Sequence, residues 1–177
     1  VPVENLVHEE GKGWTVAKYL LGHERLNTGR IGGSKRELVA LKRLAQGQRR
    51  NGRPLLEDAR FAARIAELEV DLMALEITNL RFLDQMRGGR PPGAEVSMLK
   101  IKGTEIQQRL TELMMDACGP AALRGPGADA IVADGDADAE AVTARLGLRY
   151  GNFRKTSIYA GSNEIQRNIM AKMMLGL

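Results

Sequence analysis

Cysteine and aromatic residues are scarce in this 177-residue sequence. Its one cysteine, Cys118, cannot form a disulfide within the chain. The two histidines, His8 and His23, lie far from Cys118 in sequence, so a zinc site of the usual kind is not expected. Aromatic residues, which are enriched in β-strands, make up only 4% of the chain. These absences favour a helical protein whose chemistry does not depend on a bound metal.

Long apolar runs and a strong charge imbalance are also missing. No segment is apolar over the roughly 20 residues that span a bilayer, and no basic leader with an apolar core is recognisable. We therefore expect a protein without a membrane span, in the cytoplasm. The net charge is +4, and its basic residues alternate with acidic ones along the chain. This pattern does not favour nucleic-acid binding, whereas the phosphates of a cofactor or of coenzyme A are plausible anionic ligands.

Apolar residues make up much of the sequence and recur at helical spacing. Three long segments show this period, from about Gly13 to Gln46, from Leu56 to Met86 and from Glu95 to Ala117. Two shorter helices are predicted from Thr143 to Ile158 and from Ser162 to Leu175. The positions that define the long stripes are Trp14, Ala17, Leu21, Ile31, Leu38, Leu41 and Ala45, then Phe61, Ile65, Leu68, Leu72, Leu75, Asn79, Phe82 and Met86, then Leu99, Ile106, Leu110, Leu113 and Ala117. The sequence therefore predicts an all-α fold, an antiparallel up-and-down bundle of four to five helices.

Two segments lack this period. Residues 1–10 include a proline and have the character of an extended linker that arrives from elsewhere. Residues 124–141 are rich in Gly, Ala and Asp, which is typical of a loop or an insertion. Residues 11–177 are therefore expected to form one helical domain.

A carboxylate, Glu24, falls within the first apolar stripe. It follows Leu21 by three residues and precedes Ile31 by seven, so a continuous helix would direct it towards the core. A charge there is unfavourable unless it has a partner. One interpretation is a buried ion pair or a locally hydrated position. The other is a general base, since an apolar surround raises the pKa of a carboxyl group towards neutrality.

The same segment contains Gly29, Gly32 and Gly33, which weaken a helix interior. Glycines at such positions suggest that a neighbouring helix or a flat ligand approaches the backbone closely.

The C-terminal segment from Tyr159 to Arg167 has the pattern of a turn followed by a helix start. Ser162 is well suited to cap that helix, and Ile165 stands where a capping box would have an acid. The first-turn N–H groups are therefore available to an external acceptor such as a phosphate.

Several segments, in the right order, resemble the acyl-CoA dehydrogenase family. VPVENLVHEEGKGW at the start is similar to the exit from the family's β-domain into its C-terminal bundle, which identifies residues 1–10 as the linker from such a domain. KIKGTEIQQRLTELMMDACGP resembles the family's third long helix. FRKTSIYAGSNEIQRNIMAKMMLGL resembles its closing signature and is the most specific match.

The resemblance implies an FAD-dependent enzyme that desaturates an acyl-CoA thioester between its α and β carbons. In many members the base is a glutamate directly after the signature tyrosine, but that position is Ala160 here. Another branch carries the glutamate on the first bundle helix in a Glu-Arg-Leu context, which Glu24, Arg25 and Leu26 match. The resemblance thus implies that Glu24 is the catalytic base.

The resemblance also suggests ligand-binding residues. Arg25 would lie near the thioester and orient the base. Ser162 and Glu164 match positions that contact FAD, where Glu164 would accept hydrogen bonds from ribose hydroxyls. The family's Arg-x-x-Phe-Gly motif, which reaches the FAD of a partner subunit, is replaced by QRRNGRP. This segment offers Arg49 or Arg50 near the same place, of which Arg50 is the chosen candidate, but it has no phenylalanine. The family's Gly-Gly-x-Gly element is replaced by residues 118–121.

The implied partners are an acyl-CoA substrate, electron-transfer flavoprotein as electron acceptor, and further subunits bound through the bundle in a homo- or hetero-oligomer. Three other functions stay open from the sequence. The chain could belong to a non-catalytic assembly subunit of a mixed oligomer, to an acyl-CoA oxidase-like flavoenzyme, or to a helical interaction module.

Overall fold

The structure is a computed structural model, and it describes residues 1–90, 93–123 and 139–177. Six α-helices account for most of this part: α1 (Gly13–Glu24), α2 (Ile31–Gly47), α3 (Ala59–Arg87), α4 (Ser97–Cys118), α5 (Ala139–Phe153) and α6 (Asn163–Met170), with a π-helical turn (Ala171–Leu175) after α6. Two short antiparallel strands, β1 (Arg49–Arg50) and β2 (Arg53–Pro54), form a hairpin between α2 and α3. The predicted all-α bundle is confirmed. Most of the loop predicted over residues 124–141 lies outside the described residues, and residues 139–141 belong to α5.

Short 3-10 turns connect these helices. They are Val3–Asn5, Arg25–Asn27, Leu55–Glu57, Ala94–Val96, Gly119–Leu123 and Arg154–Ser157.

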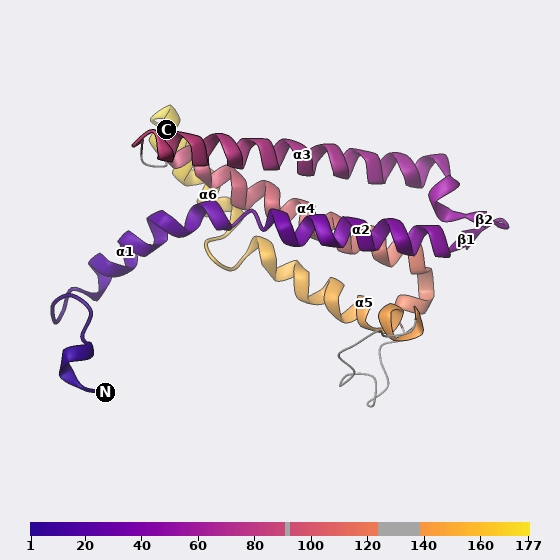
Figure 1. Ribbon diagram of the computed structural model, residues 1–177, viewed down its shortest axis with the longest axis horizontal. Helices are drawn as coiled ribbons and strands as arrows, with labels where there is room; N and C mark the ends of the chain where they lie inside the picture. Colours follow the sequence, from indigo (N-terminus) through magenta and orange to yellow (C-terminus); the bar gives the residue numbers. More distant parts are fainter. Residues whose placement is uncertain (91–92, 124–138) are drawn as a thin grey trace.

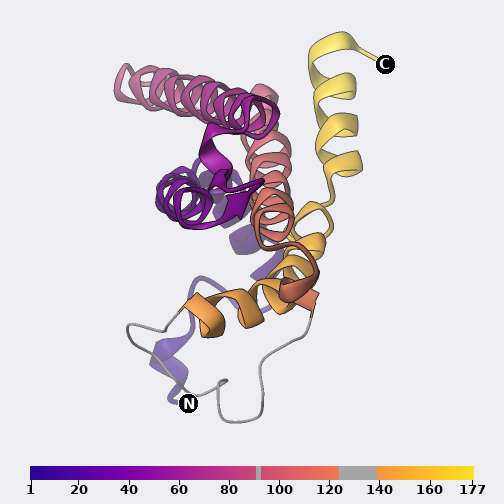
Figure 2. The ribbon, with the colours of Figure 1, turned by 90° about the vertical axis from the view of Figure 1, so that its right-hand side faces the viewer.

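Helix α4 is the centre of the bundle. It packs against α2 and α3 on one side and against α5 and α6 on the other (Figures 1 and 2). Because it has neighbours on both sides, polar residues such as Lys100, Thr104 and Gln107 are buried together with its apolar stripe. The buried apolar residues of the three long helices α2, α3 and α4 include Leu38, Leu41, Ala45, Phe61, Ile65, Leu68, Leu72, Leu75, Phe82, Leu99, Ile106, Leu110, Leu113 and Ala117.

The first predicted helix is wrong, because the chain breaks between α1 and α2. Arg30 adopts a left-handed backbone conformation with φ of 49°. Beside it, Gly29 packs so closely on α4 that a Cβ atom added to Gly103 would lie 2.6 Å from the Gly29 carbonyl oxygen. The break turns α1 away from the bundle, and Figure 1 shows α1 extending beyond the other helices. Trp14, a predicted core residue, is consequently 70% exposed.

Within the described part of the chain, no helix combines the length and the apolar character needed to cross a membrane.

Candidate functional site

A groove lies where the C-terminal end of α1 meets the start of α4 and the turn before α6. Its volume is about 410 Å³. Apolar side chains form much of its wall, and Glu24 and Lys100 are its charged residues. The lining residues are Leu21, Glu24, Thr28, Val96, Ser97, Lys100, Ala160, Gly161, Ile165, Gln166 and Ile169. The groove therefore brings together the two candidate base positions, 24 and 160.

The predicted burial of Glu24 in the bundle core is wrong, because its side chain is exposed. The core-facing prediction assumed a continuous helix, whereas α1 ends at Glu24 and the chain turns at Thr28 to Arg30. Glu24 instead lies on the wall of the groove. Arg25 follows it in the turn Arg25–Asn27, and its side chain is outside what the structure describes.

Lys100 is a buried cation on the opposite wall of the groove. Its side chain is held by an amide, since Lys100 Nζ donates to Asn163 Oδ1 at 2.9 Å. Asn163 is fixed in turn by Thr104, because Asn163 Nδ2 donates to Thr104 Oγ1 at 3.1 Å and Thr104 Oγ1 donates to the Ile101 carbonyl at 2.9 Å. Burial lowers the pKa of Lys100 below its ordinary value of 10.5, and the nearby Glu164 carboxylate opposes this shift.

The turn before α6 has an unusual backbone. Ala160 has φ of 53° and Gly161 has φ of 80°, so two consecutive residues occupy the left-handed region. A non-glycine residue there is strained, and such residues cluster at functional sites. Ser162 then caps α6, as predicted, by accepting a hydrogen bond from the Ile165 N–H at 3.4 Å.

Glu164 lies in the first turn of α6 and is exposed to solvent. Its pKa is lowered mainly by a hydrogen bond from its own backbone N–H, with smaller contributions from Ser162, Arg167 and Lys100. The carboxylate is therefore ionised near neutral pH and available as a hydrogen-bond acceptor at the edge of the groove.

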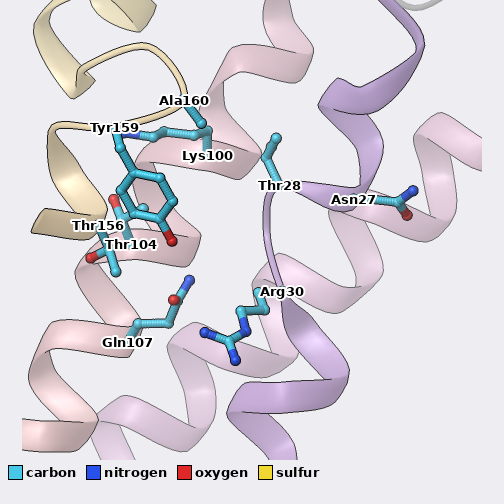
Figure 3. Close-up of a pocket in the computed structure, with 9 residues that line it drawn as sticks. All are labelled: Asn27, Thr28, Arg30, Lys100, Thr104, Gln107, Thr156, Tyr159 and Ala160. Atoms are coloured by element: carbon cyan, nitrogen blue, oxygen red, sulfur yellow. The ribbon is translucent and has the colours of Figure 1, made fainter. Parts of the chain in front are cut away.

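A second cavity of about 190 Å³ adjoins the groove, with which it shares Thr28, Lys100 and Ala160. Figure 3 shows its lining residues, which are Asn27, Thr28, Arg30, Lys100, Thr104, Gln107, Thr156, Tyr159 and Ala160. Gln107 points into this cavity from α4, and Arg30 reaches towards it from the opposite side (Figure 3). The buried polar groups thus continue from the groove along α4, through Lys100, Thr104 and Gln107.

Arg50 does not belong to this region. It lies in β1, at the end of the bundle opposite α6 (Figure 1), and forms an ion pair with Asp58 at 3.8 Å. The structure therefore separates Arg50 from Glu24, Ser162 and Glu164 within one chain.

Lys100, Gln107 and Arg30 were not among the site residues predicted from the sequence. A signal for the first two was present, since Lys100, Thr104, Gln107 and Thr111 recur every three or four residues and so share one face of α4. That face has only one charge, which is unusual for a solvated helix surface. No sequence signal for Arg30 is apparent, because its position depends on the break in the chain.

The family model described as acyl-CoA dehydrogenase, C-terminal domain, matches residues 11–175. The chain therefore belongs to the acyl-CoA dehydrogenase family and contains its C-terminal helical domain.

Curated and solved relatives agree with this assignment. Acyl-CoA dehydrogenase FadE26 of Mycobacterium tuberculosis is 28% identical over 184 residues, which cover 100% of this chain and 43% of that protein. The ChsE4–ChsE5 complex from Mycobacterium tuberculosis has a chain with a TM-score of 0.74 and 25% identity, covering 100% of this chain and 44% of that one. Glutaryl-coenzyme A dehydrogenase in its glutaryl-CoA complex has a TM-score of 0.75 at 22% identity, covering 99% of this chain and 41% of that one, and so shares the fold. The chain spans less than half the length of each of these three relatives.

Proposed function

We propose that this chain supplies the catalytic base and one wall of the substrate site of an FAD-dependent acyl-CoA dehydrogenase, with Glu24 as the base. The observation that carries the proposal is the groove that Glu24 and Ala160 line together. Family members that lack a glutamate at the position of Ala160 need a carboxylate elsewhere in reach of the same substrate carbon. Glu24, which lines the groove from α1, is proposed to meet that requirement.

The reaction needs a base beside the α-carbon of the thioester. In the proposed site Glu24 accepts the α-proton, and the exposed position of its side chain leaves it accessible to a substrate entering the groove. A bound acyl chain would cover the carboxylate and exclude water from it. Arg25, the next residue, is proposed to orient the thioester and the base. FAD, when bound, supplies the acceptor for the β-hydrogen, which leaves as hydride.

The residues around the groove fit the hydroxyl-bearing part of a flavin cofactor. Ser162 is half-buried at the start of α6, and the Glu164 carboxylate is exposed next to it. A hydroxyl-rich chain could donate to Glu164, whereas a diphosphate would be repelled by it. Arg50 lies too far away to serve the same cofactor, and we propose that it reaches the FAD of a second subunit.

The test of the catalytic assignment is the Glu24→Gln variant in the complete natural protein. Anaerobic flavin reduction by a saturated acyl-CoA should slow by about 100-fold to 10,000-fold, the usual contribution of a general base. The amide keeps the shape of the side chain but accepts no proton at neutral pH. The measurement is stopped-flow absorbance of the flavin. A parental rate in this variant would contradict the assignment.

A matched control and a rescue sharpen this experiment. Glu10→Gln makes the same chemical change at an exposed residue outside the groove and should leave the rate unchanged. Adding Ala160→Glu to the Glu24→Gln variant returns a carboxylate to the groove from the α6 side. We expect the double variant to regain part of the lost rate, since both positions line the same groove.

A second candidate function is a subunit of a hetero-oligomer that contributes assembly and leaves chemistry to another chain. A similar chain was solved as part of the ChsE4–ChsE5 complex, and this supports the alternative. Reduction of the protein's own flavin by acyl-CoA, without a partner, separates the two functions. Electron-transfer flavoprotein is the proposed electron acceptor, and peroxide production under air would instead indicate an oxidase.

A further inference from the structure

The cavity next to the groove contains an unsatisfied hydrogen-bond acceptor. Gln107 is 3% exposed, and its Nε2 donates to the Gly103 carbonyl at 3.0 Å. That bond fixes the orientation of the amide and leaves Oε1 as a buried oxygen without a partner in the described structure. A buried acceptor without a donor is unfavourable, and such groups are rare in native proteins. Gln107 Oε1 is therefore free to accept a hydrogen bond from a group placed in the cavity.

Donors lie around the same space. Arg30 is held by stacking over the Phe153 ring, with 5.5 Å between the guanidinium carbon and the ring centroid. Its backbone lies in the left-handed region, with φ of 49°, and its side chain reaches towards the cavity (Figure 3). Tyr159 presents its hydroxyl to the same space, as Figure 3 shows. The described lining includes no carboxylate, so these donors have no acidic competitor there.

The cavity continues the groove in which the acyl group would lie. Thr28, Lys100 and Ala160 form the boundary that both share, so a chain with its α-carbon beside Glu24 can extend into the cavity. A plain hydrocarbon there would leave Gln107 Oε1 without a donor and would remove water from Arg30. A hydroxyl group on the acyl chain would satisfy both Gln107 Oε1 and Arg30, because a hydroxyl donates one hydrogen bond and accepts others.

We propose that Gln107 and Arg30 select acyl-CoA substrates whose acyl group carries a hydroxyl beyond the β-carbon. This inference rests on the proposed function, and it names the substrate class of the same site. In it Gln107 Oε1 accepts from the substrate hydroxyl, and Arg30 or Tyr159 donates to the hydroxyl oxygen. Gln107 and Arg30 determine substrate specificity in this proposal, and they take no part in the proton or hydride transfer.

The test uses the complete natural protein and acyl-CoA thioesters of one chain length. One thioester is unsubstituted, others carry a hydroxyl at successive positions beyond the β-carbon, and one ends in a carboxylate. We expect kcat/KM for at least one hydroxylated thioester to exceed that of the unsubstituted one by about tenfold, the value of one well-formed hydrogen bond. In Gln107→Leu this preference should fall to near unity, whereas in Gln46→Leu, an exposed residue of α2, it should persist.

A second variant and a binding measurement keep the test decisive if Gln107→Leu does not fold. Arg30→Asn retains a residue that tolerates the left-handed backbone, and it should weaken binding of the hydroxylated thioester more than binding of the unsubstituted one. Binding is measured by calorimetry in the Glu24→Gln background, where turnover does not interfere. Equal preference for all thioesters, or a hydroxyl preference that survives both variants, would overturn this inference alone. A preference for the thioester that ends in a carboxylate, if it depends only on Arg30, would also overturn this inference. Failure of every thioester to bind would refute the proposed function as well.

Discussion

Lys100 is buried, which is unusual for a lysine. It is 4% exposed, and an amide oxygen rather than a carboxylate accepts its hydrogen bond. Burial favours the neutral amine, and this effect exceeds the attraction of the Glu164 carboxylate, so the pKa falls below 10.5. Between the lowered pKa and 10.5 the folded protein binds fewer protons at this site than the unfolded chain does.

This difference predicts a pH dependence of stability. In that window the unfolded state binds more protons, so the contribution of Lys100 to the free energy of unfolding rises with pH and levels off above 10.5. Lys100→Met should remove this rise. Urea unfolding of the parent and the variant, followed from neutral pH to about 10.5, measures the difference in slope. Lys102→Met, at an exposed lysine of the same helix, is the control, and equal slopes in both variants would contradict the prediction.

Arg154 and Gln108 together fix the turn Arg154–Ser157, which lies between α5 and α6, and Arg154 makes the charged contacts. Arg154 Nη1 donates to Glu112 Oε1 at 2.7 Å, and Nη2 donates to the Gln108 carbonyl and to Thr111 Oγ1, both at 3.0 Å. Its guanidinium also lies 4.3 Å from the centre of the Tyr150 ring. These contacts attach the chain that precedes Tyr159 and Ala160 to α4, so Arg154 positions the turn that lines the groove.

Arg154→Met should therefore destabilise the domain and loosen that turn. Loss of several hydrogen bonds to a partly exposed charged group predicts a decrease of about 2 kcal/mol in the free energy of unfolding. Denaturant unfolding measures this decrease, and hydrogen exchange should show faster exchange at residues 158–162. Arg60→Met, at an exposed residue of α3, should change neither quantity. Unchanged exchange at the turn in Arg154→Met would argue against its role in positioning.

At the level of elements, periodicity located the helices that direct a continuous apolar stripe into the core. The segment predicted from Leu56 to Met86 is α3, and the segment predicted from Glu95 to Ala117 is α4. The first helix could not be predicted in the same way, because the apolar period runs on across the break between Leu21 and Ile31. The break depends on the contact between Gly29 and Gly103, which are far apart in sequence.

The candidate site was predictable to a similar extent. Ser162 follows a local rule for helix caps, and the structure confirms that it caps α6, whereas its contact with FAD stays a prediction. The exposure of Glu24 depends on the direction of α1 after the break, which is a tertiary property. Gln107 is buried because α4 has neighbouring helices on both sides. An amphipathic pattern reveals only the apolar side of a helix, so it could not predict that the polar side of α4 is buried as well.

At the level of the whole molecule, one exposed apolar feature is a continuous stripe on the outer face of α3. Val70, Met73, Ile77 and Leu80 follow each other by three or four residues, and each is more than half exposed. Helix α3 lies at the outside of the bundle in Figure 2, so no other helix of the described chain covers this face. Contiguous apolar patches on this scale mark interaction surfaces. The resemblance to a family that oligomerises through its bundle gives the expected partner, a further subunit.

The double variant Met73→Glu, Ile77→Glu should therefore lower the oligomeric state of the complete protein. Two carboxylates in the middle of the stripe would be buried without partners in a subunit interface, which opposes association strongly. In the separated subunit they would be solvated, so the bundle itself should keep its helical circular dichroism. Sedimentation velocity measures the mass, with Leu148→Glu on α5 as a control that places the same charge on another exposed apolar residue. If the double variant sediments as the parent does, α3 is not the assembly surface, and the stripe must be covered by another part of the protein.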